Sequence, residues 1–341
     1  MSAPEKLEFA VVPGSVVHDI VRADLGRIVE LVADAYRTHA AGQTVNPASM
    51  FLRFPDRPSA RIIALPAHLG GSAPVSGLKW IASYPDNVPD GRPRASAVLL
   101  LNDARTGYPF ACLESSIISA ARTAASATLA AQALAGGRRD TERIAFVGAG
   151  VIARYIADFL IGTGWKTRQV RVHDLVPAYA GRLADHVAAA GWPRPTLAAS
   201  VDEAVRDAQL IVFATTARAP HVHDRKLFGH APHVLHVSLR DLAPEILLAA
   251  DNIVDDVDHC LTAETSPHLV ERLVGHRRFL TGTLADVLDG RARLDRGRAA
   301  IFSPFGLGIL DLVVGRYVYE QAAAKRSLVP IDNFFHERRR W

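Results

Sequence analysis

A strand, a glycine turn, a helix and a second strand ending in an acid follow one another over residues 143–174. Gly148 permits the tight turn, and Gly150 has no side chain to keep the backbone away from a pyrophosphate. The N-terminus of the new helix attracts phosphate charge. Asp174 ends the second strand, where a carboxylate can accept hydrogen bonds from both hydroxyls of an adenosine ribose. The segment therefore predicts a dinucleotide-binding site.

The surroundings of Asp174 favour NAD over NADP. A carboxylate at this position repels a 2′-phosphate, and residues 175–177 supply no arginine to hold one. We expect the other cofactor contacts at the start of the helix and at the ends of later strands, which face the ligand crevice in open α/β sheets. The predicted cofactor-binding residues are Gly148, Gly150, Val151, Ile152, Asp174, Thr215, Ser238 and Gly306.

The position of this segment in the chain predicts two domains. Residues 1–142 precede it, which is too long for an arm, and 341 residues suffice for two cores. Strand and helix patterns then alternate, so the fold class is α/β with a Rossmann-type doubly wound parallel sheet. We place the NAD-binding Rossmann domain at 126–305. The other domain takes 1–125 and is completed by 306–341.

The first domain has a mixed α+β pattern. Apolar residues at helical spacing predict one or two amphipathic helices over 16–41. Three strand-like runs follow, separated by clusters of Pro, Gly, Asp and Asn, and residues 102–107 resemble a hairpin turn. The three runs are residues 60–65, 75–81 and 95–101.

Two further helices belong to this part of the chain. Residues 114–135 are rich in Ala, Ser, Leu and Ile and predict one long helix, which Gly136 and Gly137 end. The alternation of strand and helix breaks near residue 300, and residues 309–325 predict a helix that packs back on the first domain. This domain is expected to hold the substrate.

Composition is that of an ordinary soluble enzyme, with 49% hydrophobic and 22% charged residues. The net charge is +4 and the arginines are scattered among acids, so no nucleic-acid footprint is evident. We expect the basic run 338–341 to be a solvated end. Two cysteines favour a reducing, cytoplasmic location, and no apolar run reaches the length that a membrane span needs.

Two basic side chains stand in apolar surroundings in the first domain. Lys79 lies in a strand pattern between Leu78 and Trp80, where desolvation would lower its pKa and suit it to proton transfer. A lysine on an edge strand is the alternative. Arg122 lies in an alanine-rich helix, as either a forked carboxylate clamp or an interdomain salt bridge. Arg53 and Arg61, near the first strand, are weaker candidates of the same sort.

Asp241 follows a strand of the nucleotide domain. A carboxylate there can polarise a water or a substrate amine, although it can equally cap the next helix. Several histidines precede it, but their spacings fit no compact set of metal ligands, and we predict no metal site. These histidines are His221, His223, His230, His233 and His236.

Five segments of the sequence together resemble the ornithine cyclodeaminase/mu-crystallin family. They are ALPAHLGG at 64–71, GLK at 77–79, TGYP at 106–109, AARTAA at 120–125 and GAG at 148–150. They follow the family order across nearly the whole chain. The resemblance implies an NAD-dependent enzyme of amino acids, with a substrate domain that forms a homodimer through its sheet.

Other segments resemble the branch of this family that makes L-2,3-diaminopropionate for siderophores and peptide antibiotics. They are residues 51–54, 61–66, 94–97, 109–114 and 238–241. By that resemblance the enzyme would oxidise N-(2-amino-2-carboxyethyl)-L-glutamate with NAD⁺. Hydrolysis of the imine would then release 2-oxoglutarate and L-2,3-diaminopropionate.

The same resemblance assigns roles to individual residues. Lys79 matches the active-site lysine, and Arg122 and Arg53 match carboxylate anchors. Asp241 matches the carboxylate that handles water and proton transfer. The approach to it, 238–240, departs from the glycine-rich one of cyclodeaminases and adds a cation. The expected substrate has three carboxylates, so we add two arginines to the substrate site, Arg94 and Arg240.

Other functions stay open at this point. Ornithine cyclodeaminase, ketimine reductase and alanine dehydrogenase belong to the same fold. A crystallin-like binding protein without catalysis is an alternative of another class.

Overall fold

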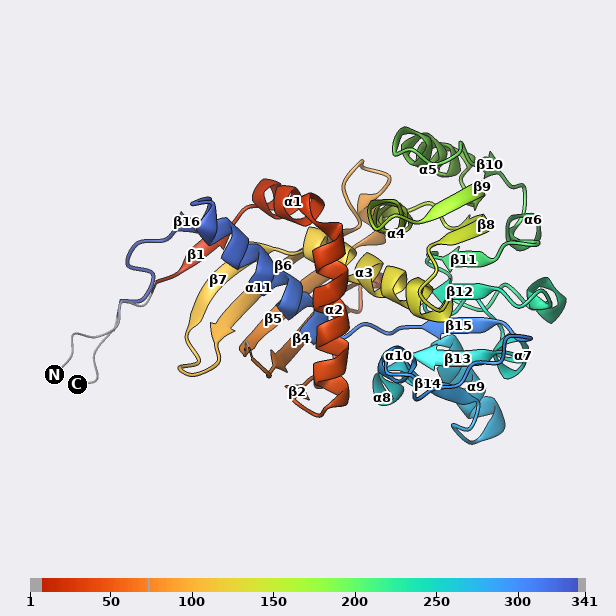
Figure 1. The fold of residues 1–341 in the computed structure, drawn as a ribbon. Helices are drawn as coiled ribbons and strands as arrows, with labels where there is room; N and C mark the ends of the chain where they lie inside the picture. The colour runs from red at the N-terminus through yellow and green to blue at the C-terminus, as the bar shows by residue number, and fades with distance from the viewer. Residues whose placement is uncertain (1–7, 73, 337–341) are drawn as a thin grey trace. The chain divides into compact units, whose positions relative to one another are not determined.

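The computed structural model describes residues 8–72 and 74–336, so the basic run 338–341 lies outside the described residues. The chain divides into two compact units (Figure 1). Unit 1 comprises residues 1–122 and 307–341, and unit 2 comprises residues 123–306.

Unit 1 is built on a mixed sheet with the strand order β16-β1-β7-β6-β5-β4-β2, and β3 pairs with β4. Strand β1 runs parallel to β7, and the other pairs are antiparallel. The three predicted runs are the central strands β4, β5 and β6, and the predicted hairpin turn joins β6 to β7. The strands are β1 (Ala10–Val12), β2 (Thr44–Val45), β3 (Met50–Phe54), β4 (Arg57–Leu69), β5 (Val75–Ser83), β6 (Ala95–Asp103), β7 (Pro109–Glu114) and β16 (Val329–Pro330).

Helices cover one face of this sheet (Figure 1). The C-terminal helix α11 packs on β4, β5 and β6, as its apolar pattern predicted. The approach is close at Gly315, because a Cβ there would lie 2.2 Å from Leu99 Cδ2. The helices are α1 (Gly14–Ala23), α2 (Leu25–Ala40), η1 (Pro85–Asn87), α11 (Gly308–Ala324) and α3 (Ser116–Leu134), within which the chain passes from unit 1 to unit 2.

Unit 2 is an α/β unit with an all-parallel sheet in the order β10-β9-β8-β11-β12-β15-β13-β14. The predicted Rossmann-type parallel sheet is therefore confirmed. From β8 the chain moves first to β9 and later to β11 on the opposite side, and the crevice between such strands is the usual ligand site. The strands are β8 (Asp140–Val147), β9 (Lys166–His173), β10 (Thr196–Leu197), β11 (Leu210–Phe213), β12 (His233–His236), β13 (Asp251–Val254), β14 (Leu280–Thr283) and β15 (Ala300–Ser303).

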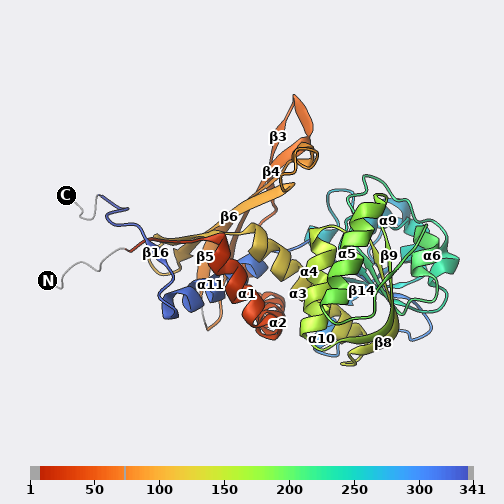
Figure 2. The same ribbon diagram turned by 90° about the horizontal axis from the view of Figure 1, so that it is seen from above.

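The helices of unit 2 connect these parallel strands. Helices α4 and α5 pack side by side (Figure 2). Within the described residues, no helix is both long and apolar enough to span a membrane. The helices are α4 (Val151–Gly162), α5 (Pro177–Ala189), α6 (Val201–Val205), η2 (Arg225–Phe228), α7 (Pro244–Leu248), α8 (Val257–Cys260), α9 (Ser266–Val274) and α10 (Leu284–Leu288).

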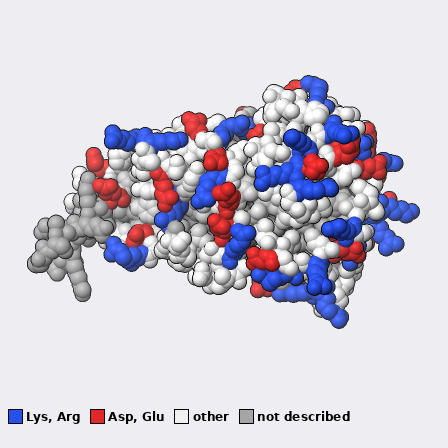
Figure 3. All heavy atoms as spheres, in the orientation of Figure 1, with Lys and Arg blue, Asp and Glu red and all other residues white. Residues whose placement is uncertain are grey.

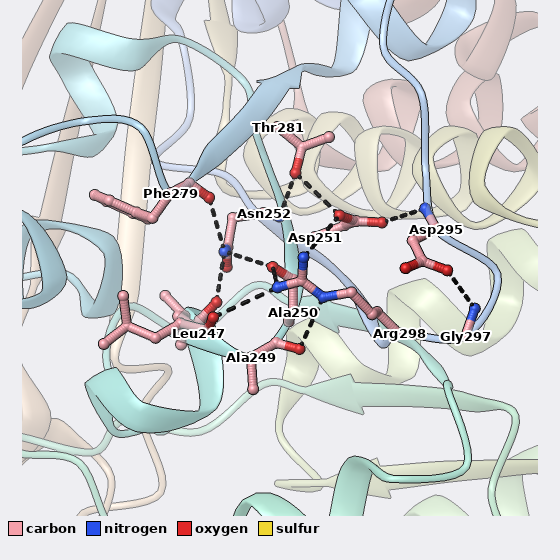
Figure 4. Close-up of polar contacts among 11 residues, drawn as sticks. Leu247, Ala249, Ala250, Asp251, Asn252, Phe279, Thr281, Asp295, Gly297 and Arg298 are labelled. Carbon is pink, nitrogen blue, oxygen red and sulfur yellow. Dashed lines mark hydrogen bonds and ion pairs between the residues drawn. The ribbon is translucent and has the colours of Figure 1, made fainter.

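A polar network holds the amino end of β13 (Figure 4). Asp251 Oδ2 accepts a hydrogen bond from the backbone N–H of Asp295 at 2.6 Å. Asn252 Nδ2 donates to three backbone carbonyls, and Arg298 donates to carbonyls of residues 248–250. Because ligands of parallel sheets bind at the carboxyl ends of the strands, we assign this network to the stability of the fold.

Acidic and basic side chains are interspersed on the face that Figure 3 shows. Neither sign forms a continuous patch over the elements visible there. The distribution of charge on this face agrees with the scattering of arginines among acids in the sequence.

Candidate functional site

Gly148 makes the turn between β8 and α4. Its φ is +90°, and a Cβ at this position would lie 2.6 Å from the carbonyl oxygen of Ala214. Its N–H donates to the carbonyl of His173 at 2.8 Å, which ties the turn to the end of β9. Both the backbone conformation and the space therefore require glycine here.

Gly150 is the N-cap of α4, and a Cβ there would meet no heavy atom within 4 Å. The first N–H groups of a helix, here those of Val151 and Ile152, have no intrahelical partner. A hollow of about 270 Å³ beside them is lined by residues 149–151 and by side chains of α5. Free donors next to open space fit the pyrophosphate of a dinucleotide.

The carboxylate of Asp174 lies against this turn. Oδ2 accepts the N–H of Ala149 and Oδ1 accepts the N–H of Val176, each at 2.8 Å. Each oxygen keeps a further lone pair that a ribose hydroxyl can use. The position fits the predicted ribose contact.

The other predicted cofactor residues all follow the carboxyl ends of strands. Thr215 comes after β11, and its hydroxyl donates to Asp241. Ser238 comes after β12, and its buried hydroxyl lies beside the carboxylate of Asp241. Gly306 comes after β15, and its N–H donates to the buried carboxylate of Asp255 at 2.6 Å. These three lie at the edge where α/β sheets bind ligands.

Lys79 is buried in unit 1, with only 2% of its surface exposed. It lies on β5, between β4 and β6, so the interpretation as an edge-strand lysine is wrong. Its Nζ donates to Asp311 Oδ2 at 2.7 Å and to Ser119 Oγ at 3.2 Å. The cation is thus held between the sheet, α3 and α11.

Asp311 also pairs with Arg122, whose Nε lies 3.3 Å from Asp311 Oδ1. Both residues belong to unit 1, so this ion pair is not an interdomain salt bridge. No hydrogen bond joins the terminal nitrogens of Arg122 to any other residue that the structure describes. The end of the guanidinium fork remains able to bind a carboxylate.

Asp311 is not among the site residues predicted from the sequence. The sequence does contain a signal for it, because Asp311 is an acid within the apolar run 309–314. Arg122 was predicted from the same kind of signal, a charged residue among apolar ones. Asp311 is fully buried, and its two oxygens serve Lys79 and Arg122 separately. One carboxylate therefore orients both predicted site cations.

The environment of Lys79 changes its acidity. Burial lowers the pKa of Lys79 to about 8, although the charge of Asp311 opposes this shift and Arg122 reinforces it. A lysine with such a pKa can exist as the neutral amine at mildly alkaline pH, which proton abstraction requires.

Asp241 follows β12 in unit 2 and is fully buried. Oδ1 lies 2.9 Å from Nε2 of His221 and also accepts the hydroxyl of Thr215. The next helix, α7, has Ala243 at its N-cap with no side-chain hydrogen bond, so the interpretation of Asp241 as a helix cap is wrong.

A second imidazole lies beside the same carboxylate. His236 Nε2 accepts the backbone N–H of Asp241 at 3.1 Å, and its Nδ1 lies 3.2 Å from Ser303 Oγ. Burial alone would raise the pKa of Asp241, but the polar side chains around the carboxylate, those of His221, His236 and Ser238, hold this pKa well below its usual range. Within the described residues, no group of three or more His, Cys, Asp and Glu could hold a metal ion.

Among the described residues, three predicted substrate arginines form no hydrogen bond or ion pair with the side chains of these clusters. Arg53 is exposed on β3, where it pairs with Arg61 of β4. Lys79 pairs with Leu65 of β4, and Leu65 is about 13 Å along that strand from Arg61. Arg94 is exposed just before β6. Arg240 donates to the carbonyl of Ala263 at 2.8 Å. Their roles stay predictions.

The chain is similar to known enzymes in sequence and in fold. Over 312 residues the chain is 30% identical to N-((2S)-2-amino-2-carboxyethyl)-L-glutamate dehydrogenase of Staphylococcus aureus, covering 86% of this chain and 89% of that protein. The fold of this chain is similar to that of Delta(1)-pyrroline-2-carboxylate reductase of Thermococcus litoralis, solved with NADH and L-proline. The TM-score is 0.86 at 23% identity, over 95% of this chain and 100% of the other.

An archaeal alanine dehydrogenase, solved as a dimer with bound NAD, is similar with a TM-score of 0.84. The identity is 25%, and the match covers 96% of this chain and 100% of that chain. The pattern that describes the ornithine cyclodeaminase/mu-crystallin family matches residues 16–326. The resemblance found in the sequence motifs is confirmed, and the chain belongs to the ornithine cyclodeaminase/mu-crystallin family.

Proposed function

We propose that this protein is an NAD-dependent dehydrogenase that cleaves N-(2-amino-2-carboxyethyl)-L-glutamate to 2-oxoglutarate and L-2,3-diaminopropionate. The observation that carries the proposal is the buried cluster of Lys79, Asp311 and Arg122. It combines a lysine fit for proton abstraction with a guanidinium fit for a carboxylate. The Staphylococcus aureus relative with this activity in its name supports the choice of substrate.

NAD is the cofactor of this proposal. The turn at Gly148, the open space at Gly150 and the carboxylate of Asp174 would hold it, with further contacts from Val151 and Ile152. When bound, NAD⁺ supplies the acceptor for the hydride that leaves the glutamate Cα. The family relatives solved with NAD or NADH support this choice.

The first step is oxidation of the glutamate C–N bond. Arg122 would fix a carboxylate of the glutamate part of the substrate, with Arg53 as a candidate for a second anchor, and such positioning contributes up to ~7–11 kcal/mol when fully realised. Neutral Lys79 takes one proton from the secondary ammonium of the substrate. A hydride then leaves the Cα, and the substrate becomes an iminium ion.

The second step is hydrolysis of that iminium ion. Water adds to the former Cα, and both water protons end on the departing nitrogen, which leaves as the ammonium of diaminopropionate. Asp241 and the polar groups around it serve this step. Arg94 and Arg240 are the candidates for the additional carboxylates of the substrate.

Absorbance of NADH tests the proposal. We expect stoichiometric NADH and 2-oxoglutarate when the purified protein is mixed with NAD⁺ and N-(2-amino-2-carboxyethyl)-L-glutamate. Ornithine or alanine in parallel reactions should give neither. Proline and ammonia from ornithine without net NADH would instead identify a cyclodeaminase, and NADH from alanine alone would identify an alanine dehydrogenase. If none of these substrates gave NADH or product, a binding protein without catalysis would be favoured.

We also propose a homodimer that forms through the sheet of unit 1. Trp80 on β5 and Val98 on β6 are cross-strand partners, and each is 41% exposed. Side chains alternate between the two faces along a strand, so the side chains of Trp80 and Val98 lie on one face of the sheet and that of Lys79 lies on the other. An exposed apolar sheet face is a typical protein interface, and the archaeal relative was solved as a dimer.

A further inference from the structure

Two short segments of unit 2 are bound to each other at Asp241. The backbone carbonyl of Asp241 accepts the N–H groups of His221 and Val222, each at 3.0 Å. Val222 also forms a parallel bridge with Leu242. These contacts hold the imidazole of His221 beside the carboxylate, where Nε2 lies 2.9 Å from Oδ1.

The two side chains differ in their access to solvent. The side chain of Asp241 is 0% exposed, whereas that of His221 is 37% exposed. A carboxylate enclosed in this way does not touch a water molecule or a substrate directly. His221 is the partner through which it can act on either.

The contact also determines which nitrogen of His221 carries the proton. An ionised carboxylate only accepts hydrogen bonds, so Nε2 must be the protonated nitrogen. The lone pair is then on Nδ1, which has no hydrogen-bond partner among residues 8–72 and 74–336. His221 therefore presents a basic nitrogen, oriented by the carboxylate behind it.

His236 does not have this freedom. Its Nε2 already accepts the backbone N–H of Asp241, and its Nδ1 faces the hydroxyl of Ser303. The ring is also fully buried. Of the two imidazoles at the carboxylate, His221 alone can exchange a proton with a reactant.

We propose that His221 and Asp241 form an acid–base dyad in which His221 Nδ1 is the general base for hydrolysis of the imine and Asp241 is the positioning residue. This inference rests on the proposed function and deepens its second step. It moves the contact with water from Asp241, where the family resemblance placed it, to the imidazole.

The protons and electrons of the step balance. Water gives one proton to Nδ1 as its oxygen bonds to the iminium carbon, and the electron pair of the C–N double bond moves to nitrogen. The imidazolium returns this proton to nitrogen. The C–N bond then breaks with its electron pair on nitrogen, while the hydroxyl proton passes through the same imidazole to the amine. The products are a ketone and an ammonium ion, and nothing is oxidised or reduced.

The test separates the two steps of the reaction. In His221→Ala we expect a retained burst of one NADH per site, while steady formation of 2-oxoglutarate falls by about 10²–10⁴-fold, the usual contribution of a general base. Added imidazole should restore part of the rate. His223→Ala is the matched control, because this exposed histidine pairs with Glu245 and should behave as wild type.

His221→Gln provides a second variant of similar size that still donates to Asp241. It should bind NADH normally and show the same loss of 2-oxoglutarate formation, without rescue by imidazole, because its amide is not a base. Wild-type rates in either variant would overturn the dyad. So would equal loss of the NADH burst and of 2-oxoglutarate in a variant that still binds NADH.

A separate measurement does not depend on the substrate. Two-bond ¹H–¹⁵N correlation spectra of histidine-labelled protein should show His221 as the Nε2–H tautomer, and Asp241→Asn should remove this preference. An Nδ1–H tautomer in the wild type would overturn the dyad. The wild-type protein could show the Nε2–H tautomer and yet form no NADH from N-(2-amino-2-carboxyethyl)-L-glutamate. This result would contradict the proposed substrate but not the dyad.

Discussion

At the scale of single residues, the acidity of Lys79 sets the first testable property of the enzyme. Burial lowers its pKa to about 8, and only the neutral amine can accept a proton from the substrate. Below this pKa the lysine is protonated, so kcat/KM should fall about tenfold for each pH unit as pH decreases. Above it, the contribution of Lys79 should level off. Steady-state NADH formation at a series of pH values measures the profile.

Lys79→Ala is the companion variant. We expect it to abolish turnover at every pH and to leave NAD binding within a few fold, because the cofactor turn lies in unit 2. Fluorescence titration with NADH supplies the control. Turnover at the wild-type rate would remove Lys79 from the mechanism.

Asp311 should matter both for stability and for the acidity of Lys79. Asp311→Asn leaves two buried cations without their carboxylate, which typically costs roughly 3–5 kcal/mol of unfolding free energy. The charge of Asp311 raises the pKa of Lys79, so its removal should shift the pH profile to lower pH.

Denaturant unfolding and the pH profile measure these two effects. Glu320→Gln is the control on the same helix, because Glu320 pairs with Arg316 in an exposed i,i+4 pair and should change stability by less than about 1 kcal/mol. An unchanged pH profile in folded Asp311→Asn would contradict the role of Asp311.

At the scale of structural elements, two glycines of one turn should fail in different ways. Gly148→Ala combines a positive φ with a clash against the carbonyl of Ala214, so it should lower the unfolding free energy by at least about 1–3 kcal/mol. Gly150→Ala meets no protein atom, although Ala is a poorer N-cap residue than Gly by up to about 1 kcal/mol. Its methyl group would instead occupy the space expected for the pyrophosphate.

Thermal unfolding and NAD titration together distinguish the two variants. Gly150→Ala should lower the Tm only slightly and lose most of its NAD affinity, whereas Gly148→Ala should lower both strongly. A Gly150→Ala protein with unchanged NAD affinity would place the pyrophosphate elsewhere.

The same elements show which features of the fold and of the site could be predicted from the sequence alone. The turn at 143–174 was predictable because glycine geometry, helix start and terminal acid are all encoded within a short stretch. The pairing of Lys79 with Asp311 was not, since it joins residues 232 positions apart and depends on how α11 lies on the sheet. The contact of His221 with Asp241 also needs the packing of two loops. Short strands such as β1 and β16 lack a pattern of their own and form only by pairing.

At the scale of the whole molecule, the proposed chemistry uses residues of both units. Lys79, Arg122 and Asp311 belong to unit 1, whereas Asp174, His221 and Asp241 belong to unit 2. In the proposed reaction the first set serves C–N oxidation and the second serves cofactor binding and imine hydrolysis. Variants of Lys79, Arg122 or Asp311 should therefore prevent NADH formation, whereas variants of His221 or Asp241 should form one NADH per site and then release little 2-oxoglutarate.

The proposed dimer is the last expectation at this scale. Trp80→Glu puts a charge on the exposed apolar face of the unit 1 sheet, and burying an unpaired charge in an interface is strongly unfavourable. Analytical ultracentrifugation should show a dimer for the wild type and a monomer for this variant. Leu273→Glu is the control, because Leu273 is 65% exposed on α9 of unit 2, outside the proposed interface. If Trp80→Glu stayed dimeric, or if Leu273→Glu alone became monomeric, the sheet of unit 1 would not be the interface.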